Sequence, residues 1–82
     1  MIKIKNNVAV SDSGFIFNPD TGESFTVNPI GVEIIKLLKE GKTVDTITEE
    51  LQKTYATDAQ TLEKDAEDFI GLLRNFSIAE NE

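Results

Sequence analysis

The dipeptide Asn28-Pro29 divides the chain into two parts with different hydrophobic periods. Asn at an N-cap followed by Pro at the first helical position is a typical helix start, because the N–H that Pro lacks has no partner there anyway. Before this point, short apolar runs alternate with turn residues, which indicates strands. After it, apolar residues recur every three or four positions, which indicates helices. Strands followed by helices predict an α+β domain.

The first part predicts three short strands. Turn residues at 11–14 separate the first strand from a second at residues 15–17, and the turn at residues 18–22 leads into a third at residues 23–27. The apolar residues of the first strand share even positions, and therefore one face, unless Asn6-Asn7 interrupts it. They are Ile2, Ile4, Val8 and Val10. A three-stranded antiparallel sheet this small is not stable alone in water, so we expect the helices to cover it.

The second part predicts three helices. The first begins at Asn28-Pro29 and ends at Gly41, the second is capped by Thr43, and residues 57–60 have the form of a capping box for the third. Their apolar positions are Ile30, Ile34, Leu37 and Leu38, then Val44, Ile47, Leu51 and Tyr55, then Leu62, Ala66, Phe69, Ile70, Leu73 and Phe76. The first two helices and the turn between them resemble a helix-turn-helix, so the fold is expected to be winged-helix-like. We expect one domain over residues 1–78 and a frayed tail at residues 79–82.

The residue types that carry most enzyme chemistry are missing. The sequence contains no histidine and no cysteine, which removes the commonest general base, the commonest nucleophile and the usual zinc, copper and haem ligands. The adjacent acids Glu49-Glu50 and Glu67-Asp68 point in different directions on a helix and do not face a common substrate. We therefore predict no catalytic residues, no metal site and no cofactor, and an enzyme is the least favoured class.

The charge distribution narrows the choice of partner. Eight basic residues against fifteen acids give a net charge of −7, and residues 42–82, with four bases and ten acids, carry −6 of it. A DNA-binding surface needs clustered basic residues, so nucleic acid is disfavoured, as is an anionic membrane surface. The sequence shows no signal peptide and no apolar run long enough to cross a bilayer. With no cysteine, the chain is expected to work in the cytoplasm.

The third predicted strand offers backbone groups that a ligand can use. Residues 23–27 contain no Lys or Pro of the kind that blunts an exposed sheet edge. If this strand lies at an edge beside the third helix, the two form a groove that accepts an extended peptide as a fourth strand. The alternative is a covered or central strand, and periodicity alone does not separate the two.

Residues 14–31 resemble the centre of the PqqD-like family, which is named for a pyrroloquinoline quinone biosynthesis protein. Residues 34–44 resemble the family's first helix, turn and second helix start, and residues 65–73 resemble its final helix. The resemblance implies a non-catalytic, winged-helix-like module that binds the leader of a ribosomally made precursor peptide. It would present that leader to a modifying enzyme, often a radical SAM protein.

By this resemblance, the leader pairs with the third strand and lies against the third helix. The implied peptide-binding residues are Glu23, Ser24, Phe25, Thr26, Val27, Leu62, Asp65, Ala66, Phe69 and Leu72. Asp65 and Leu72 are the better groove candidates, whereas Phe69 fits the core better. The acids of the third helix either steer a leader that carries Lys or Arg, or only keep the domain soluble.

Two other classes of function remain open at this point. A winged-helix DNA-binding regulator suits the fold but not the charge. A structural homodimer or protein-adaptor domain suits a small fold with an open sheet edge, because such an edge can pair with itself.

Overall fold

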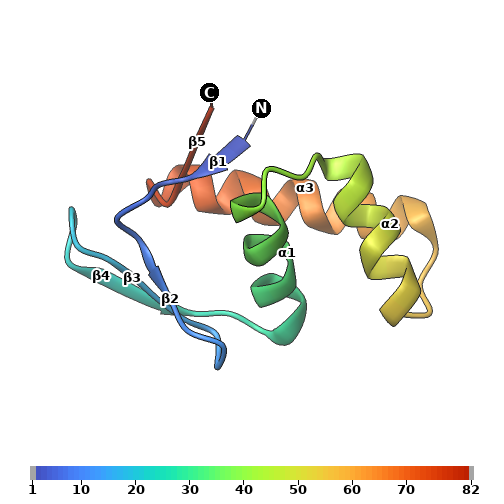
Figure 1. Ribbon diagram of the computed structural model, residues 1–82, viewed down its shortest axis with the longest axis horizontal. Helices are drawn as coiled ribbons and strands as arrows, with labels where there is room; N and C mark the ends of the chain where they lie inside the picture. Colours follow the sequence, from blue (N-terminus) through green and yellow to red (C-terminus); the bar gives the residue numbers. More distant parts are fainter. Residues whose placement is uncertain (1, 82) are drawn as a thin grey trace.

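The computed structural model describes residues 2–81 and places a small sheet beside a layer of helices (Figure 1). In chain order, the described elements are β1 (Ile2–Ile4), β2 (Ala9–Val10), β3 (Phe15–Asn18), β4 (Glu23–Thr26), α1 (Pro29–Lys39), α2 (Val44–Thr54), α3 (Ala59–Asn75) and β5 (Ala79–Asn81). This confirms the α+β class, the three-stranded antiparallel sheet and the three helices.

The three-stranded sheet has the order β2-β3-β4, with both pairs antiparallel. Alternate residues of β3 point to opposite faces. Ile16 is fully buried against the helices, whereas Phe15 and Phe17 face outward and stay exposed. The predicted first strand is wrong as one element, because a turn at Asn6-Asn7 splits it into β1 and β2.

The prediction of a frayed tail is wrong for residues 79–81, which form β5 and pair antiparallel with β1. Ser77, at φ 60°, turns the chain after α3. Ile78 and Ala79 then enter the core with 1% and 4% of their surface exposed. Burial of these two side chains and pairing with β1 hold the segment in place. Glu82 lies outside the described residues.

The predicted caps of the first two helices are confirmed, whereas the N-cap of α3 is Asp58, one residue after the Thr57 that a capping box at residues 57–60 implies. The side chain of Asn28 accepts a hydrogen bond from the Gly31 N–H at 2.8 Å, and Thr43 caps α2 in the same way. Asp58 accepts the Thr61 N–H at 3.0 Å. The bonds that Asp58 receives from the backbone and side chain of Thr61 hold the pKa of its carboxyl below the usual value. These caps satisfy N–H groups that the first helical turn leaves without partners.

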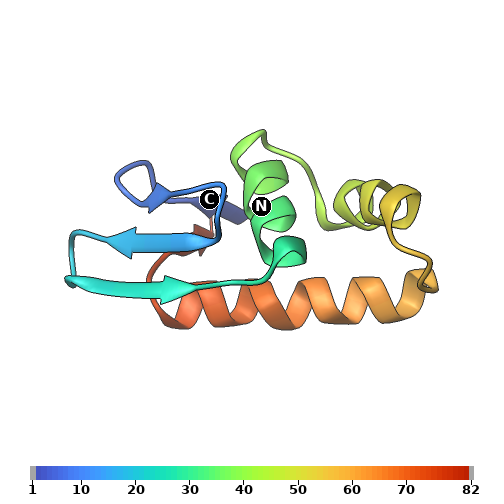
Figure 2. The ribbon, with the colours of Figure 1, turned by 90° about the horizontal axis from the view of Figure 1, so that it is seen from below.

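The core lies where the inner face of the sheet meets the three helices. Ile16, Ile35 and Ile47 are fully buried there, so strand and helices share one hydrophobic cluster. In Figure 2, α3 runs along the bottom of the molecule, with β4 beside its C-terminal end and α2 above its N-terminal end. The long helix therefore supports both the helical layer and the last strand of the sheet.

Candidate functional site

β4 is an edge strand of the sheet. Among the described residues it pairs only with β3, so the alternative of a central strand is wrong. Just beyond the end of β4, the Val27 N–H donates to the carbonyl of Gly14, the residue before β3, at 2.8 Å. Because inward and outward backbone groups alternate along an antiparallel strand, Phe25 also points its N–H at β3, while Ser24 and Thr26 point theirs outward.

An apolar pocket of about 100 Å³ lies between β4 and the C-terminal half of α3. The rings of Phe25 and Phe76, which both line it, contact each other, with centroids 4.6 Å apart and planes tilted by 51°. Leu72 and Phe76 are 49% and 37% exposed, so part of the lining faces solvent. The residues that line the pocket are Ile16, Phe25, Thr26, Val27, Phe69, Leu72, Leu73, Phe76 and Ile78.

A second pocket, of about 300 Å³, lies between the start of α1 and the middle of α3. Phe69 lines both pockets, so they adjoin along α3, and we call the two together the groove. Gly31 lets α1 approach the helix here, because a Cβ at this position would lie only 3.1 Å from Cζ of Phe69. Two carboxylates line this end of the groove: Asp65, and Asp68, which pairs with Lys64 at 3.6 Å. Its lining residues are Asn28, Ile30, Gly31, Ile34, Asp65, Asp68 and Phe69.

Asn18 holds the two walls of the groove together at the sheet end. It is fully buried, and its Nδ2 donates to the carbonyls of Phe76 and Ser77, at 3.4 and 3.3 Å. Its Oδ1 accepts the Asp20 N–H at 3.1 Å. One side chain therefore fixes both the turn before β4 and the end of α3. The sequence showed Asn18 only as a turn residue.

The structure brings together some of the sequence-predicted site residues and separates others. Phe69, Leu72 and Asp65 line the groove beside β4. Leu62 and Ala66 do not, because they are 4% and 0% exposed and belong to the core. The prediction that these two residues line the groove was therefore wrong. They follow the same three- to four-residue spacing as the other buried residues of α3, Ile70 and Leu73, and so share the helix face that packs into the core.

Sequence reasoning missed one groove residue, at the C-cap of α3. Phe76, which was expected on the core face, lines the apolar pocket. Asp68, considered only among the acids of the third helix that could steer a basic leader, lines the acidic end. The spacing of Phe69, Leu72 and Phe76, at three and four residues, was the signal that could have identified a second apolar stripe.

Other kinds of site are not found in residues 2–81. No group of three or more acidic, histidine or cysteine residues there could hold a metal ion. Within the same residues, no helix is both long enough and apolar enough to span a bilayer. The groove is therefore the principal candidate site.

The family model for coenzyme PQQ synthesis protein D (PqqD) matches residues 14–76, which include both walls of the groove. The chain belongs to the PqqD family. Its fold is similar to a solved structure of TbiB1 in complex with the TbiA(beta) leader peptide, with a TM-score of 0.87 and 30% sequence identity. That match covers 98% of this chain and 96% of TbiB1. No curated protein matches.

A second solved structure, of lasso peptide synthetase B1 complexed with the leader peptide, also has a TM-score of 0.87. The match covers 98% of both chains at 16% identity, which is a likeness of fold. The PqqD-family fold of this chain therefore occurs in two proteins solved with leader peptides bound.

Proposed function

We propose that this chain is a non-catalytic adaptor that binds the leader of a ribosomally made precursor peptide as an added strand on β4. The observation that carries the proposal is the unpaired edge of β4 beside the apolar pocket on α3. The likeness to TbiB1, solved with a leader peptide, supports it.

The geometry suits strand addition. The outward N–H and C=O groups of Ser24 and Thr26 can pair with an extended peptide whatever its sequence, and this pairing supplies affinity. Alternate side chains of that peptide face α3, where Phe69, Leu72 and Phe76 offer apolar contacts. Selectivity for the leader then comes from the pocket, and Asp65 favours a leader with Lys or Arg near the acidic end.

The adaptor presents its cargo to a modifying enzyme, such as a radical SAM protein, in the cytoplasm. With no histidine and no cysteine, the chain lacks the side chains that most often do such chemistry, so a separate enzyme is needed. Both similar solved structures are complexes with a leader peptide, so they do not favour the alternative function of a DNA-binding regulator.

The test is an NMR titration of the ¹⁵N-labelled chain with the leader of a short precursor peptide encoded beside its gene. We expect amide shifts in residues 23–27 and in the groove-facing residues of α3, and no shifts in α2. Saturating leader that moves nothing in a folded chain excludes that cargo. Sizing at several concentrations then tests the remaining alternative, a homodimer formed through β4.

A further inference from the structure

A second surface carries the opposite charge from the groove. Pockets lie where β1 and the residues after it meet the C-terminal end of α1 and the turn into α2. In Figure 2 the turn after β1 and the end of α1 lie at the top of the molecule, whereas β4 and α3 lie at the bottom. A ligand in the groove therefore leaves this surface free.

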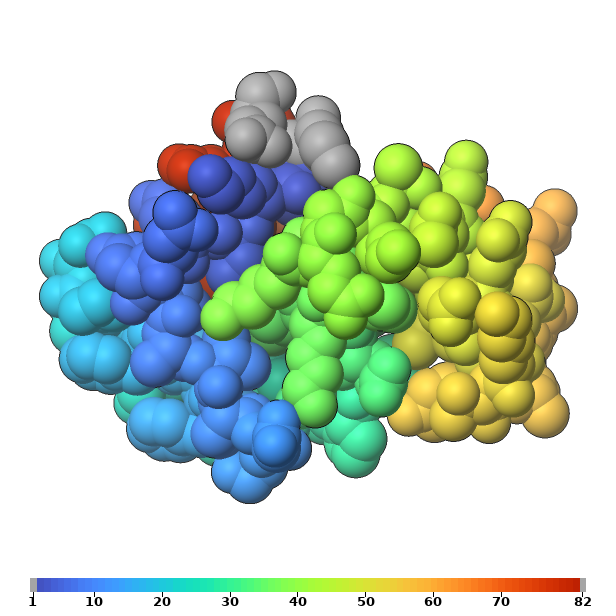
Figure 3. Space-filling view, viewed as in Figure 1, coloured from blue at the N-terminus to red at the C-terminus, as the bar shows by residue number. Residues whose placement is uncertain are grey.

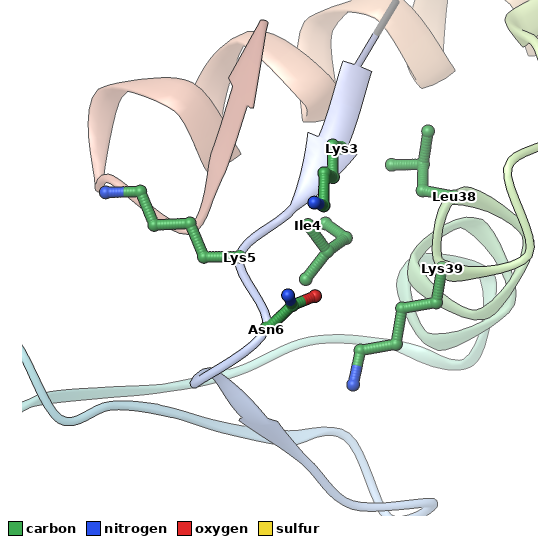
Figure 4. A pocket seen from close by; sticks show the side chains of 6 residues that line it. All are labelled: Lys3, Ile4, Lys5, Asn6, Leu38 and Lys39. Carbon is green, nitrogen blue, oxygen red and sulfur yellow. The ribbon is translucent and has the colours of Figure 1, made fainter. Parts of the chain in front are cut away.

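The first of these pockets has a volume of about 210 Å³ and contains Lys3, Lys5 and Lys39 in its lining, with Ile4 and Leu38. Figure 4 shows the side chains of Lys3 and Lys39 on either side of the Asn6 amide, while Lys5 points away. The ammonium groups of Lys3 and Lys39 therefore flank the pocket, above the buried side chains of Ile4 and Leu38.

The adjoining pocket, of about 350 Å³, is lined by Ile2, Leu38, Lys42, Thr43 and Val44. Leu38 lines both pockets, so they adjoin each other. Figure 3 shows this face of the molecule, with β1 and the end of α1 side by side. We call it the lysine surface, defined by Lys3, Lys39 and Lys42.

The lysine surface is unusual for this chain. None of the described residues that line its two pockets is acidic, although the chain carries a net charge of −7. Lys36 nearby pairs with Asp12 at 3.0 Å, but within residues 2–81 the three lysines of the surface form no ion pair. Glu80 stands opposite Lys3 in the β1–β5 pair and lines neither pocket.

We propose that the lysine surface docks an acidic amphipathic segment of the enzyme that modifies the bound peptide. The complementarity is in both charge and polarity. Ile2 and Val44, which are partly exposed, accept apolar side chains, and the neighbouring ammonium groups attract carboxylates and speed association. The identity of the partner as the modifying enzyme rests on the proposed function. The inference that the partner is acidic with an apolar stripe rests only on the lysine surface itself.

The shape of the surface favours a peptide segment over a small anion. A phosphate would use the ammonium groups of Lys3 and Lys39 and leave the apolar pocket beside Lys42 empty. An amphipathic helix fills both, because its apolar stripe and its acidic flanks are presented together.

The experiment titrates the ¹⁵N-labelled chain with a short acetylated model peptide that carries Leu at helical spacing and Glu at the remaining positions. We expect amide shifts confined to residues 2–6 and 38–44 and weakened by added salt. A second peptide with Lys in place of every Glu should give none. Inorganic phosphate alone is the third probe. No shifts with the acidic peptide, or equal shifts with phosphate alone, overturn the proposal.

Charge-reversal variants identify the residues responsible. Lys39→Glu combined with Lys42→Glu should weaken binding of the acidic peptide about tenfold. The control Lys53→Glu on α2, which has a similar exposed lysine, should change nothing. Equal weakening by both overturns the proposal. Because Lys39 lies in the last turn of α1 and favours the helix dipole, the milder Lys39→Gln and Lys42→Gln pair, checked by melting, repeats the test.

The two proposals can fail separately. Retained leader binding in the Lys39→Glu, Lys42→Glu variant, with loss of acidic-peptide binding, supports two independent surfaces. If wild type binds the acidic peptide at the lysine surface but not the leader, that leader is excluded as the cargo of the groove and the charge complementarity of the lysine surface stands. If leader shifts and acidic-peptide shifts both map to β4, the lysine surface is not a docking site.

Discussion

Proline at position 24 should weaken strand addition while leaving the fold intact. The Ser24 N–H points away from β3, so Ser24→Pro removes a donor from the free edge and no hydrogen bond from the sheet. A leader strand paired there would be left with an unmatched carbonyl, which costs about 1–3 kcal/mol. The dissociation constant should therefore rise about 5- to 150-fold, and Thr26→Pro should behave alike.

The assay is isothermal titration calorimetry of each variant with the leader, after thermal melting has shown that it folds. Ser24→Ala is the matched control, because it removes the hydroxyl and keeps the N–H, and its affinity should match the wild type. Phe25→Pro is the opposite control, since the Phe25 N–H faces β3 and its loss should lower stability. Unchanged leader affinity in folded Ser24→Pro and Thr26→Pro variants would refute pairing at β4.

The other predictions concern glycines, and thermal melting checks each of them. At Gly14, with φ +96°, an added Cβ would lie 2.3 Å from the Val27 carbonyl oxygen, so Gly14→Ala should cost at least about 3 kcal/mol and lower Tm by more than about 12 °C. Gly22→Ala, with φ +77° and no atom near the new Cβ, should cost only about 1 kcal/mol, and equal losses would contradict the clash. Gly71→Ala in open space on α3 should gain about 0.5–1 kcal/mol, and a lower Tm would show an unrecognised contact.

The helices could be predicted because local chemistry determines where they begin. Asn28, Thr43 and Asp58 each have a side chain that satisfies a first-turn N–H, and the cap needs no distant partner. The order of strands and helices could be predicted because the spacing of apolar residues, also a local feature, changes at Asn28-Pro29 from that of strands to that of helices.

The parts that could not be predicted depend on contacts between distant residues. β5 is a three-residue strand whose partner β1 is at the other end of the chain, so no local pattern marks it. Asn18 is a residue type common in turns, but its side chain also bonds to carbonyls more than fifty positions away in the sequence, which no local pattern reveals. The lysine surface is also assembled by folding, since Lys3 and Lys39 approach one pocket only when β1 packs beside α1.

The two faces of α3 show why the candidate site was harder to predict than the fold. α3 carries two apolar stripes: a buried one of Leu62, Ala66, Ile70 and Leu73, and a second one of Phe69, Leu72 and Phe76 that faces β4. Because successive residues of a helix are 100° apart, the centres of the two stripes are only about 80° apart around the helix axis. The sequence therefore shows one broad apolar face, and Leu62 and Ala66 were assigned to the groove from it. The two stripes separate by exposure, because the second keeps Leu72 and Phe76 in contact with solvent. Apolar surface left exposed beside an unpaired strand costs solubility without adding to the core, and a leader that covers both is the simplest account of it.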